Sequence, residues 1–166
     1  PSIMQRSALP PIANRLLDRH RQEGVELHLG RLLTEIHGTG RVRAVSLDDG
    51  TLIESRLVLK GLGVQPEWRW LEGSGIEVNR GVIVDARCRT NDPDVFAAGD
   101  CAESRHPLYA EPVVLESVQN AVTQGKLCAA AILGQDASYD DVPWFWSEQY
   151  DFRLQMAGLP QANDTV

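Results

Sequence analysis

Three short, uninterrupted apolar runs place the strongest constraint on how this chain folds. They are Leu57-Val58-Leu59, Val82-Ile83-Val84 and Val95-Phe96-Ala97-Ala98, and each is bounded by charged residues or glycine. A strand that is apolar at every position is buried on both faces, which is typical of a parallel sheet covered by helices. The runs therefore predict an α/β fold built on short parallel strands.

The region before these runs follows other patterns. Apolar residues spaced by three or four positions after Pro10-Pro11 predict a helix that ends at Gly24. From Val25 to Ser55, apolar and polar residues alternate between glycine-containing turns. That alternation predicts an antiparallel meander with one buried face.

The region after the runs contains the longest predicted helix. Apolar residues recur every three or four positions over residues 114–133, and Gly134 ends the pattern. Gly125 inside the helix predicts close packing against a strand or a ligand. Residues 136–141 are polar and are typical of a linker, and Pro143-Trp144-Phe145-Trp146 then begins an aromatic segment.

Composition excludes several classes of function. The 166 residues carry a formal charge of −7, and the basic residues are dispersed, which argues against nucleic acid as a partner. No apolar run approaches the roughly 20 residues that cross a bilayer. Cys88, Cys101 and Cys128 are odd in number, far apart and in no CxxC pair. They favour a reducing cytoplasm over a disulfide framework or a metal site.

The clearest site signal is Gly99-Asp100, which directly follows the third apolar run. Ligands of open α/β sheets bind at the carboxyl ends of the strands. A glycine there allows a ligand to approach the backbone, and a carboxylate accepts hydrogen bonds from sugar hydroxyls. The competing interpretation is an ordinary turn in which Asp100 caps the backbone.

Residues 90–102 (TNDPDVFAAGDCA) closely resemble the second FAD-binding motif of flavoprotein reductases that have two dinucleotide-binding domains. The resemblance implies that Asp100 hydrogen-bonds the ribityl chain of FAD. Residues 116–121 (ESVQNA) are similar to the segment that opens the helix behind the flavin, with the backbone near Val118 facing the pyrimidine end of the ring. A helix N-terminus there would meet the negative charge of reduced flavin. The alternative is that Val118 is a plain core valine.

Residues 57–66 (LVLKGLGVQP) resemble the strand and glycine turn with which the NAD(P)H domain of these reductases returns the chain to the FAD domain. The resemblance implies that Gly61 and Gly63 give the dinucleotide room, and a purely structural turn is the competing interpretation. The GxGxxG turn that holds the pyrophosphate is expected upstream of Pro1.

Residues 142–151 (VPWFWSEQYD) and 154–158 (LQMAG) resemble the junction into the C-terminal domain of ferredoxin reductases that serve cytochromes P450 and ring-hydroxylating dioxygenases. Rubredoxin reductases are neighbours of this group. Trp146 matches a tryptophan that lies near the flavin and toward the redox partner. A hydrophobic anchor for the C-terminal domain is the alternative for Trp146. Glu148 departs from the family, which more often has Asp.

The resemblance covers about residues 1–160 and divides the chain into three parts. Residues 1–63 would be the C-terminal half of an NAD(P)H-binding domain, 64–136 the second segment of an FAD-binding domain, and 137–166 the start of the C-terminal reductase domain. The implied fold class is α/β, with incomplete Rossmann-like sheets and an antiparallel meander before an α+β domain. The start at Pro1 and the end just after a predicted strand at 152–159 suggest a fragment.

The implied parent enzyme passes electrons from NAD(P)H through FAD to a ferredoxin-type iron–sulfur protein. No side chain is expected to act as acid, base or nucleophile, because the flavin performs the transfer. Two alternatives stay open: a related reductase with rubredoxin or oxygen as acceptor, and an inactive truncated oligomer. The open edges of the predicted parallel strands favour a homo-oligomer, most economically a swapped dimer.

Overall fold

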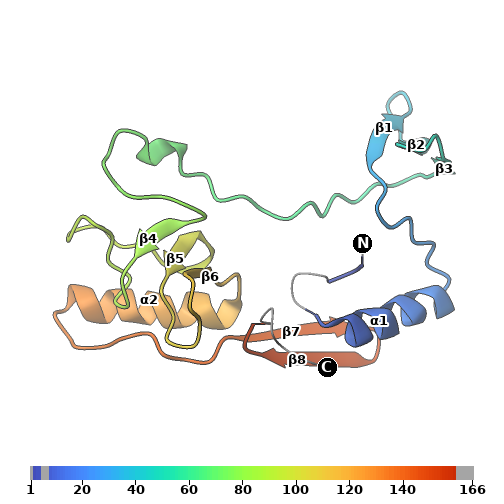
Figure 1. The fold of residues 1–166 in the computed structure, drawn as a ribbon. Coiled ribbons are helices and arrows are strands. Elements are labelled where there is room, and N and C mark those ends of the chain that lie inside the picture. The colour runs from blue at the N-terminus through green and yellow to red at the C-terminus, as the bar shows by residue number, and fades with distance from the viewer. Residues whose placement is uncertain (1, 5–7, 160–166) are drawn as a thin grey trace. The chain divides into compact units, whose positions relative to one another are not determined.

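The computed structural model describes residues 2–4 and 8–159. They form two compact units, which we call the N-terminal unit (the described residues up to Gly63) and the C-terminal unit (Val64–Leu159). Figure 1 shows their helices and strands. Neither of the two α-helices in the described part of the chain is long and apolar enough to cross a membrane.

Helix α1 (Pro10–Gln22) is the helix predicted after Pro10-Pro11, and that prediction is confirmed. Proline fits the first helical positions because the first N–H groups of a helix have no acceptor within it. The helix buries Ala13, Leu16 and Leu17. Its last turn carries basic residues, which lie at the negative end of the helix dipole.

Strands β1 (Leu33–His37), β2 (Ala44–Leu47) and β3 (Leu52–Glu54) pair antiparallel in that order. The predicted meander is therefore confirmed from β1 onward. Gly38 begins the β1–β2 turn with φ +137°, and a Cβ at this position would collide with the carbonyl oxygen of Arg41. The turn thus requires glycine.

Two segments predicted as strands in this unit are irregular instead. In residues 25–29 the chain forms no ladder, and the N–H of Arg31 closes a turn by donating to the carbonyl of His28 at 3.4 Å. In residues 57–59, Leu57 is 71% exposed and Leu59 86% exposed. A strand needs a neighbour to pair its N–H and C=O groups. The described residues offer neither segment such a neighbour, so both predictions are wrong here.

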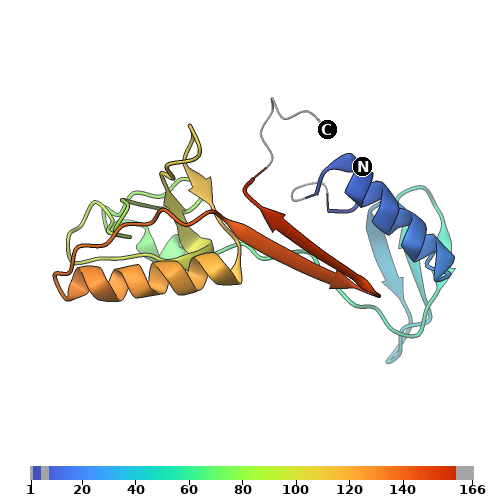
Figure 2. The same ribbon diagram turned by 90° about the horizontal axis from the view of Figure 1, so that it is seen from below.

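Strands β4 (Val82–Val84), β5 (Ala102–Ser104) and β6 (Val113–Val114) form the sheet of the C-terminal unit, in the order β4-β5-β6. β4 and β5 are parallel, as predicted for the apolar run at β4, whereas β5 and β6 are antiparallel. Helix α2 (Val118–Ile132) lies along one side of this sheet (Figures 1 and 2). It begins later than predicted because Val113–Val114 pairs with β5.

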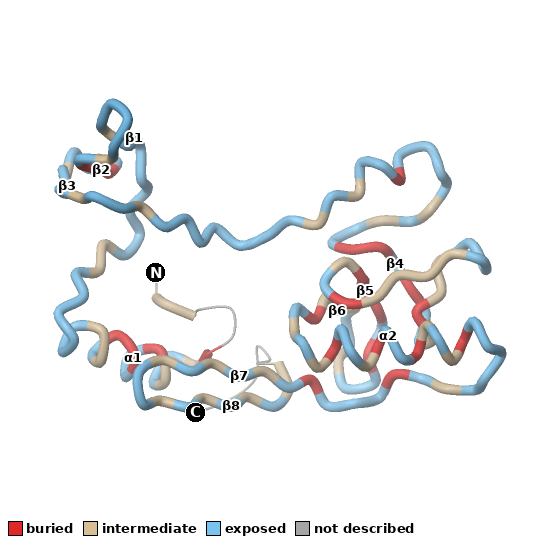
Figure 3. Tube along the Cα trace, turned by 180° about the vertical axis from the view of Figure 1, so that it is seen from behind, coloured by how far each residue is buried: buried red, intermediate tan, exposed pale blue. Residues whose placement is uncertain are grey.

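Burial concentrates in this unit around the sheet and the inner side of α2, whereas residues 59–65 are exposed (Figure 3). Two apolar clusters form its core. One contains Leu71, Val82, Val84 and Ala102, and the other contains Cys88, Leu115, Leu127 and Tyr139.

The third apolar run, residues 95–98, forms a single bridge rather than a strand. The turn at Asn91–Asp94 folds the run back on residues 88–90, so that Phe96 pairs with Arg89 alone. The strand comes later, at β5, after the 3-10 turn η2 (Gly99–Cys101). Gly99-Asp100 therefore precedes a strand instead of following one. The backbone groups of the run bond to residues 88–92 and are not available to pair with a strand of the sheet.

The end of the described chain is an antiparallel hairpin of β7 (Trp144–Gln149) and β8 (Phe152–Ala157). Tyr150 adopts φ +57° in the tight turn between them. The predicted strand after residue 152 is thus confirmed. Upstream of β4, the chain forms the 3-10 turn η1 (Arg69–Leu71).

Candidate functional site

The turn Gly99–Cys101, here named the Gly-Asp turn, packs on the first half of α2. Gly99 has φ +75°, a left-handed conformation that favours glycine. A Cβ at Gly99 would lie 3.4 Å from the Cβ of Ala121 in α2. The backbone conformation therefore favours glycine here, and the turn lies in van der Waals contact with the helix.

A buried amide holds the Gly-Asp turn to the helix. The N–H of Gly99 donates to Oε1 of Gln124 at 2.7 Å, and Gln124 is 2% exposed. The same oxygen accepts from Nδ2 of Asn120 at 3.3 Å, and Nδ2 also donates to the carbonyl of Leu115 at 2.8 Å. Oδ1 of Asn120 is buried without a hydrogen-bond partner. The sequence analysis singled out neither side chain for this role, although a polar pair four residues apart inside an apolar helix pattern is a usable signal.

The start of α2 presents free backbone donors. Ser117 caps the helix by accepting the N–H of Asn120 at 3.2 Å, while the N–H groups of Val118 and Gln119 have no acceptor within the helix. The first turn itself contains no acidic residue, and the nearest carboxylates belong to Glu116, before the cap, and to Asp141, which accepts from the side chains of Gln119 and Thr123. The Val118 side chain is 61% exposed, which does not fit a plain core valine.

Asp100 is exposed, one residue after the anchored Gly99. Its carboxylate is therefore open to solvent and to a ligand, rather than consumed by the core. The Gly-Asp turn and the start of α2 thus lie together, which is the arrangement that the flavin interpretation of Asp100 and Val118 requires. The role of each residue toward a cofactor stays a prediction.

The expected polar linker at 136–141 is packed instead of free, because it brings the aromatic hairpin to α2. Tyr139 is buried, and Oδ2 of Asp141 accepts from Thr123 at 3.0 Å and from Nε2 of Gln119 at 3.3 Å. Oε1 of Gln119 in turn accepts the N–H of Trp144 at 3.2 Å. The first turn of α2 is thereby tied to the first residue of β7.

Trp144 and Trp146 lie on the same face of β7, and their rings stack at 5.1 Å between centroids with 27° between planes. They are 37% and 43% exposed. Neither is a fully buried anchor, and together they form a flat aromatic surface on the hairpin that Gln119 attaches to α2. Whether Trp146 adjoins a flavin stays a prediction.

Gly61 and Gly63 belong to the N-terminal unit, whereas the other predicted site residues belong to the C-terminal unit. Gly63 has φ +78°, so its turn favours glycine for conformational reasons alone. A Cβ would meet no atom within 4 Å at either position. These observations fit the structural-turn interpretation and leave room for a ligand.

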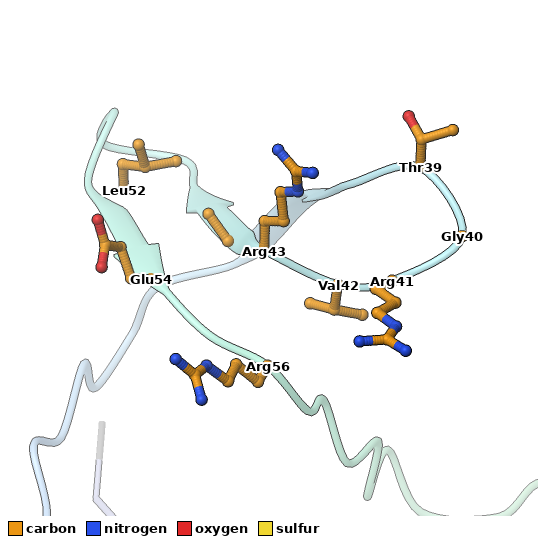
Figure 4. A pocket seen from close by; sticks show the side chains of 9 residues that line it. Thr39, Gly40, Arg41, Val42, Arg43, Leu52, Glu54 and Arg56 are labelled. Carbon is orange, nitrogen blue, oxygen red and sulfur yellow. The ribbon is translucent and has the colours of Figure 1, made fainter.

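The N-terminal unit also has an open groove between the β1–β2 turn and β3 (Figure 4). Arg41, Arg43 and Arg56 line it, and their guanidinium groups point in different directions in Figure 4, with Glu54 also on its wall. Because these charges do not converge on one point, the groove has no geometry for one small anion.

Two cysteines of the C-terminal unit, Cys88 and Cys128, are not set up as nucleophiles. Burial, with the neighbouring Cys128 thiol, raises the pKa of Cys88 to about 12. Burial likewise raises the pKa of Cys128. The Cys88 thiol donates weakly to the carbonyl of Gln124 at 3.8 Å. Both thiols are protonated at neutral pH, and a protonated thiol is a poor nucleophile.

Comparisons with known proteins identify the chain's relatives. A curated relative from Sphingobium sp., the 5,5'-dehydrodivanillate O-demethylase ferredoxin reductase subunit, is 42% identical over 98% of this chain and 40% of its own length. Putidaredoxin reductase from Pseudomonas putida is 33% identical over 99% of this chain and 40% of its length. The chain thus spans about two fifths of the curated relatives that it matches.

Solved structures agree with these relatives. The ferredoxin reductase for the CYP199A2 system of Rhodopseudomonas palustris is 39% identical, with a TM-score of 0.91 over 99% of this chain and 41% of that chain. A covalent putidaredoxin reductase–putidaredoxin complex matches with a TM-score of 0.92 and 32% identity, over 99% of this chain and 40% of that chain.

Two family models match the sequence. The reductase C-terminal model matches residues 144–166, which include the aromatic hairpin. The model for pyridine nucleotide-disulphide oxidoreductases matches residues 1–125, most of the chain. The predicted fold class, pieces of dinucleotide-binding α/β domains followed by the start of a reductase C-terminal domain, is confirmed. The chain belongs to the pyridine nucleotide-disulphide oxidoreductase family.

Proposed function

We propose that this chain is part of an FAD-dependent NAD(P)H:ferredoxin oxidoreductase. One observation carries the proposal: the Gly-Asp turn, the start of α2 and the aromatic hairpin are joined by hydrogen bonds at one end of one helix. Relatives named ferredoxin reductases match the chain over nearly its whole length. The partner would be a ferredoxin-type iron–sulfur protein that serves a P450 or a dioxygenase.

The residues at this helix end fit a flavin. Gly99 brings backbone close to the helix, and the exposed Asp100 carboxylate can accept hydrogen bonds from the sugar-alcohol chain. The free N–H groups at Val118 and Gln119, with no acidic side chain in the turn, favour negative charge at the pyrimidine side. FAD, when bound, supplies the hydride acceptance and the one-electron release, so this chain needs no acid, base or nucleophile.

Other parts of the chain would serve the two electron-transfer partners of the flavin. Trp146, on the flat aromatic surface of β7, would cover the flavin edge and contact the iron–sulfur protein. Gly61 and Gly63 would leave room for NAD(P)H. In this assignment residues 1–63 belong to the NAD(P)H domain, 64–136 to the FAD domain and 137–166 to the C-terminal domain.

Absorbance and turnover test this proposal. The flavoprotein that carries this sequence, purified with FAD, should show flavin bands near about 450 nm. It should also reduce a ferredoxin with NADH or NADPH under steady-state conditions. A preparation that takes up no flavin would contradict the proposal.

A rubredoxin acceptor is the second candidate, because rubredoxin-NAD(+) reductase from Ectopseudomonas oleovorans is 36% identical over all of this chain and 43% of its own length. Parallel steady-state assays with a ferredoxin, a rubredoxin and oxygen at equal concentrations separate the candidates. We expect the highest kcat/KM with the ferredoxin, and a higher value with rubredoxin would transfer the proposal to that acceptor.

For the 166 residues alone we propose a cofactor-free homo-oligomer, such as a swapped dimer, in the cytoplasm. Four apolar side chains between residues 57 and 64 are 71–86% exposed, which favours burial against another copy: Leu57, Leu59, Leu62 and Val64. The free thiols suit a reducing compartment. Analytical ultracentrifugation should give mass above that of the 18.3 kDa chain. A monomer at all concentrations, or stoichiometric flavin in this preparation, would contradict this assignment.

A further inference from the structure

We propose that Gln124 is a positioning residue for the flavin site, acting through the backbone of Gly99 on the placement of Asp100. The inference rests on the proposed function, since Asp100 is assigned there to the sugar-alcohol chain of FAD. Gln124 itself is 2% exposed and touches no ligand.

The side-chain oxygen of Gln124 bonds the Gly-Asp turn and α2. It accepts from Gly99 N–H at 2.7 Å and from Asn120 Nδ2 at 3.3 Å, while the backbone carbonyl of Gln124 accepts weakly from Cys88. Removal of the oxygen would take this acceptor from the buried Gly99 N–H, whereas Asn120 Nδ2 would keep its bond to the carbonyl of Leu115. The bond to Gly99 is the shortest of the set.

This bond fixes one end of the Gly-Asp turn, and the sheet fixes the other. Ala102, the first residue of β5, pairs with Val82 in the parallel ladder. Asp100 lies between these two anchors, and the close approach of Gly99 to Ala121 limits rotation of the turn toward the helix. Without the Gln124 acceptor, the turn would be held by the sheet and by the hydrogen bond from Ala97 N–H, two residues before Gly99, to the carbonyl of Cys88.

The anchor also sets Asp100 against the helix start. Gln124 lies six residues after Val118 in one continuous helix, a rise of about 9 Å. A rigid helix therefore carries both the N-terminal donors proposed for the ring and the acceptor that holds the turn. Gln124 would thereby hold two flavin contacts in a fixed relative position: the contact at the ring and the contact at the sugar-alcohol chain.

Three variants of the flavin-loaded protein that carries this sequence test the inference. Q124M keeps the length and burial of the side chain but removes the acceptor, and Q124E retains an acceptor for both donors. K126M places the same methionine at an exposed position of the same helix as a matched control. The measurement is FAD affinity, from the change in flavin fluorescence on titration of the apoprotein.

We expect Q124M to weaken FAD binding about tenfold, the loss typical of one buried hydrogen bond. Q124E should lie within about threefold of wild type and K126M should not differ from it, on the same scale. Wild-type affinity in Q124M would overturn the inference while leaving the proposed function intact, whereas a wild-type protein without affinity for FAD would overturn the proposed function.

A thermodynamic cycle with D100A decides whether Gln124 acts through Asp100. If it does, Q124M should weaken FAD binding far less in the D100A background than alone, because the group that it positions is already gone. Additive losses would show a purely structural role and would overturn the inference. Should Q124M fail to fold, Q124N, which withdraws the amide by one methylene, takes its place in the same cycle.

Discussion

Two triplets of the chain consist of similar aliphatic residues but adopt different structures. Leu57-Val58-Leu59 in the N-terminal unit is irregular and largely exposed, whereas Val82-Ile83-Val84 in the C-terminal unit is the strand β4, with Val82 and Val84 buried. Sequence alone assigns both to a buried parallel sheet. Within the described chain, only Val82-Ile83-Val84 lies in a parallel sheet.

The difference lies in the neighbours. β4 pairs with β5 along its length and contributes to a cluster with Leu71 and Ala102. No described strand pairs with residues 57–59. A continuous apolar run indicates that both faces of the segment are buried, but it does not identify the elements that bury them. The comparison therefore predicts that equal substitutions in the two regions have unequal effects on stability.

The largest difference is expected at the two glycines beside these triplets. In G81A the new Cβ would lie 2.9 Å from both the carbonyl oxygen of Cys101 and the N–H nitrogen of Glu103, which are backbone atoms of β5 and its approach. We expect G81A to lower the free energy of unfolding of the C-terminal unit by about 3 kcal/mol. All four tryptophans of the chain lie in that unit, so urea unfolding followed by tryptophan fluorescence measures it alone.

G61A is the matched control, because a Cβ at Gly61 meets no atom within 4 Å. Its urea unfolding, followed by far-UV circular dichroism, should stay within about 0.5 kcal/mol of wild type. If G81A were as stable as G61A, the close approach of Gly81 to β5 would not exist in solution, and the contrast between the triplets would lose its basis.

A smaller difference is expected when one apolar side chain of each triplet is shortened. V84A leaves a cavity beside Leu71 and Ala102, and we expect it to lower the unfolding free energy by about 2 kcal/mol. L59A removes a side chain that is 86% exposed within one chain, so at a dilution where the chain is monomeric it should change stability by less than about 0.5 kcal/mol. At concentrations where the proposed homo-oligomer forms, L59A should cost more, because Leu59 is then covered by a second copy. Equal losses in V84A and L59A at every dilution would contradict the contrast between the triplets.

The same contrast explains what sequence could predict of the fold. Helix α1, the meander from β1 onward and strand β8 follow from local patterns, since their hydrogen bonds close within each segment or between adjacent segments. The strand predicted at residues 95–98 failed because the turn at Asn91–Asp94 pairs that run with residues 88–90, a competition that apolar periodicity does not register. Burial is predicted correctly where the element that packs over the segment is part of the described chain.

The candidate site divides in a similar way. Motif resemblance pointed to Gly99, Asp100 and the start of α2, and the structure brings these parts together, while their role toward a ligand stays a prediction. It did not point to Gln124 or to Asp141, whose hydrogen bonds join segments distant in sequence. Tyr139 was assigned to a linker because its polar neighbours dominate the local composition, although its ring is buried in the core. Contacts of this kind depend on the tertiary structure.

A pH-dependent difference is expected from two carboxylates, one in each unit. Glu103 in β5 is 2% exposed. Burial alone would raise its pKa, but the side-chain and backbone N–H groups of Arg80 outweigh burial and hold the pKa below its ordinary value of 4.5. A carboxyl whose folded pKa is lowered contributes stability that is present above its unfolded pKa and lost as the pH falls through the folded pKa.

E103Q should therefore cost about 1 kcal/mol at pH 7, a modest value because Arg80 is largely exposed. The difference in unfolding free energy between E103Q and wild type should shrink below pH 4.5, the ordinary pKa of this carboxyl group. D49N in the N-terminal unit is the comparison, since Asp49 also has a lowered pKa, from its hydrogen bonds with Thr51, but lies at the exposed surface. Urea midpoints at several pH values should depend on pH less in E103Q than in wild type, and D49N should show a smaller change in the same direction. A gap that widens toward acid pH would contradict the assigned role of Glu103.

A further small effect on stability is expected at Trp146, which combines features of both triplets: it belongs to a formed strand, yet it is 43% exposed. W146A loses the stacking with Trp144 and should lower the unfolding free energy by about 0.5 kcal/mol, as measured by far-UV circular dichroism in urea. An exposed aromatic surface that contributes so little to stability is typical of a surface that binds a partner. A loss above about 2 kcal/mol would instead identify Trp146 as an anchor of the hairpin, the core-like role that β4 has and residues 57–59 lack.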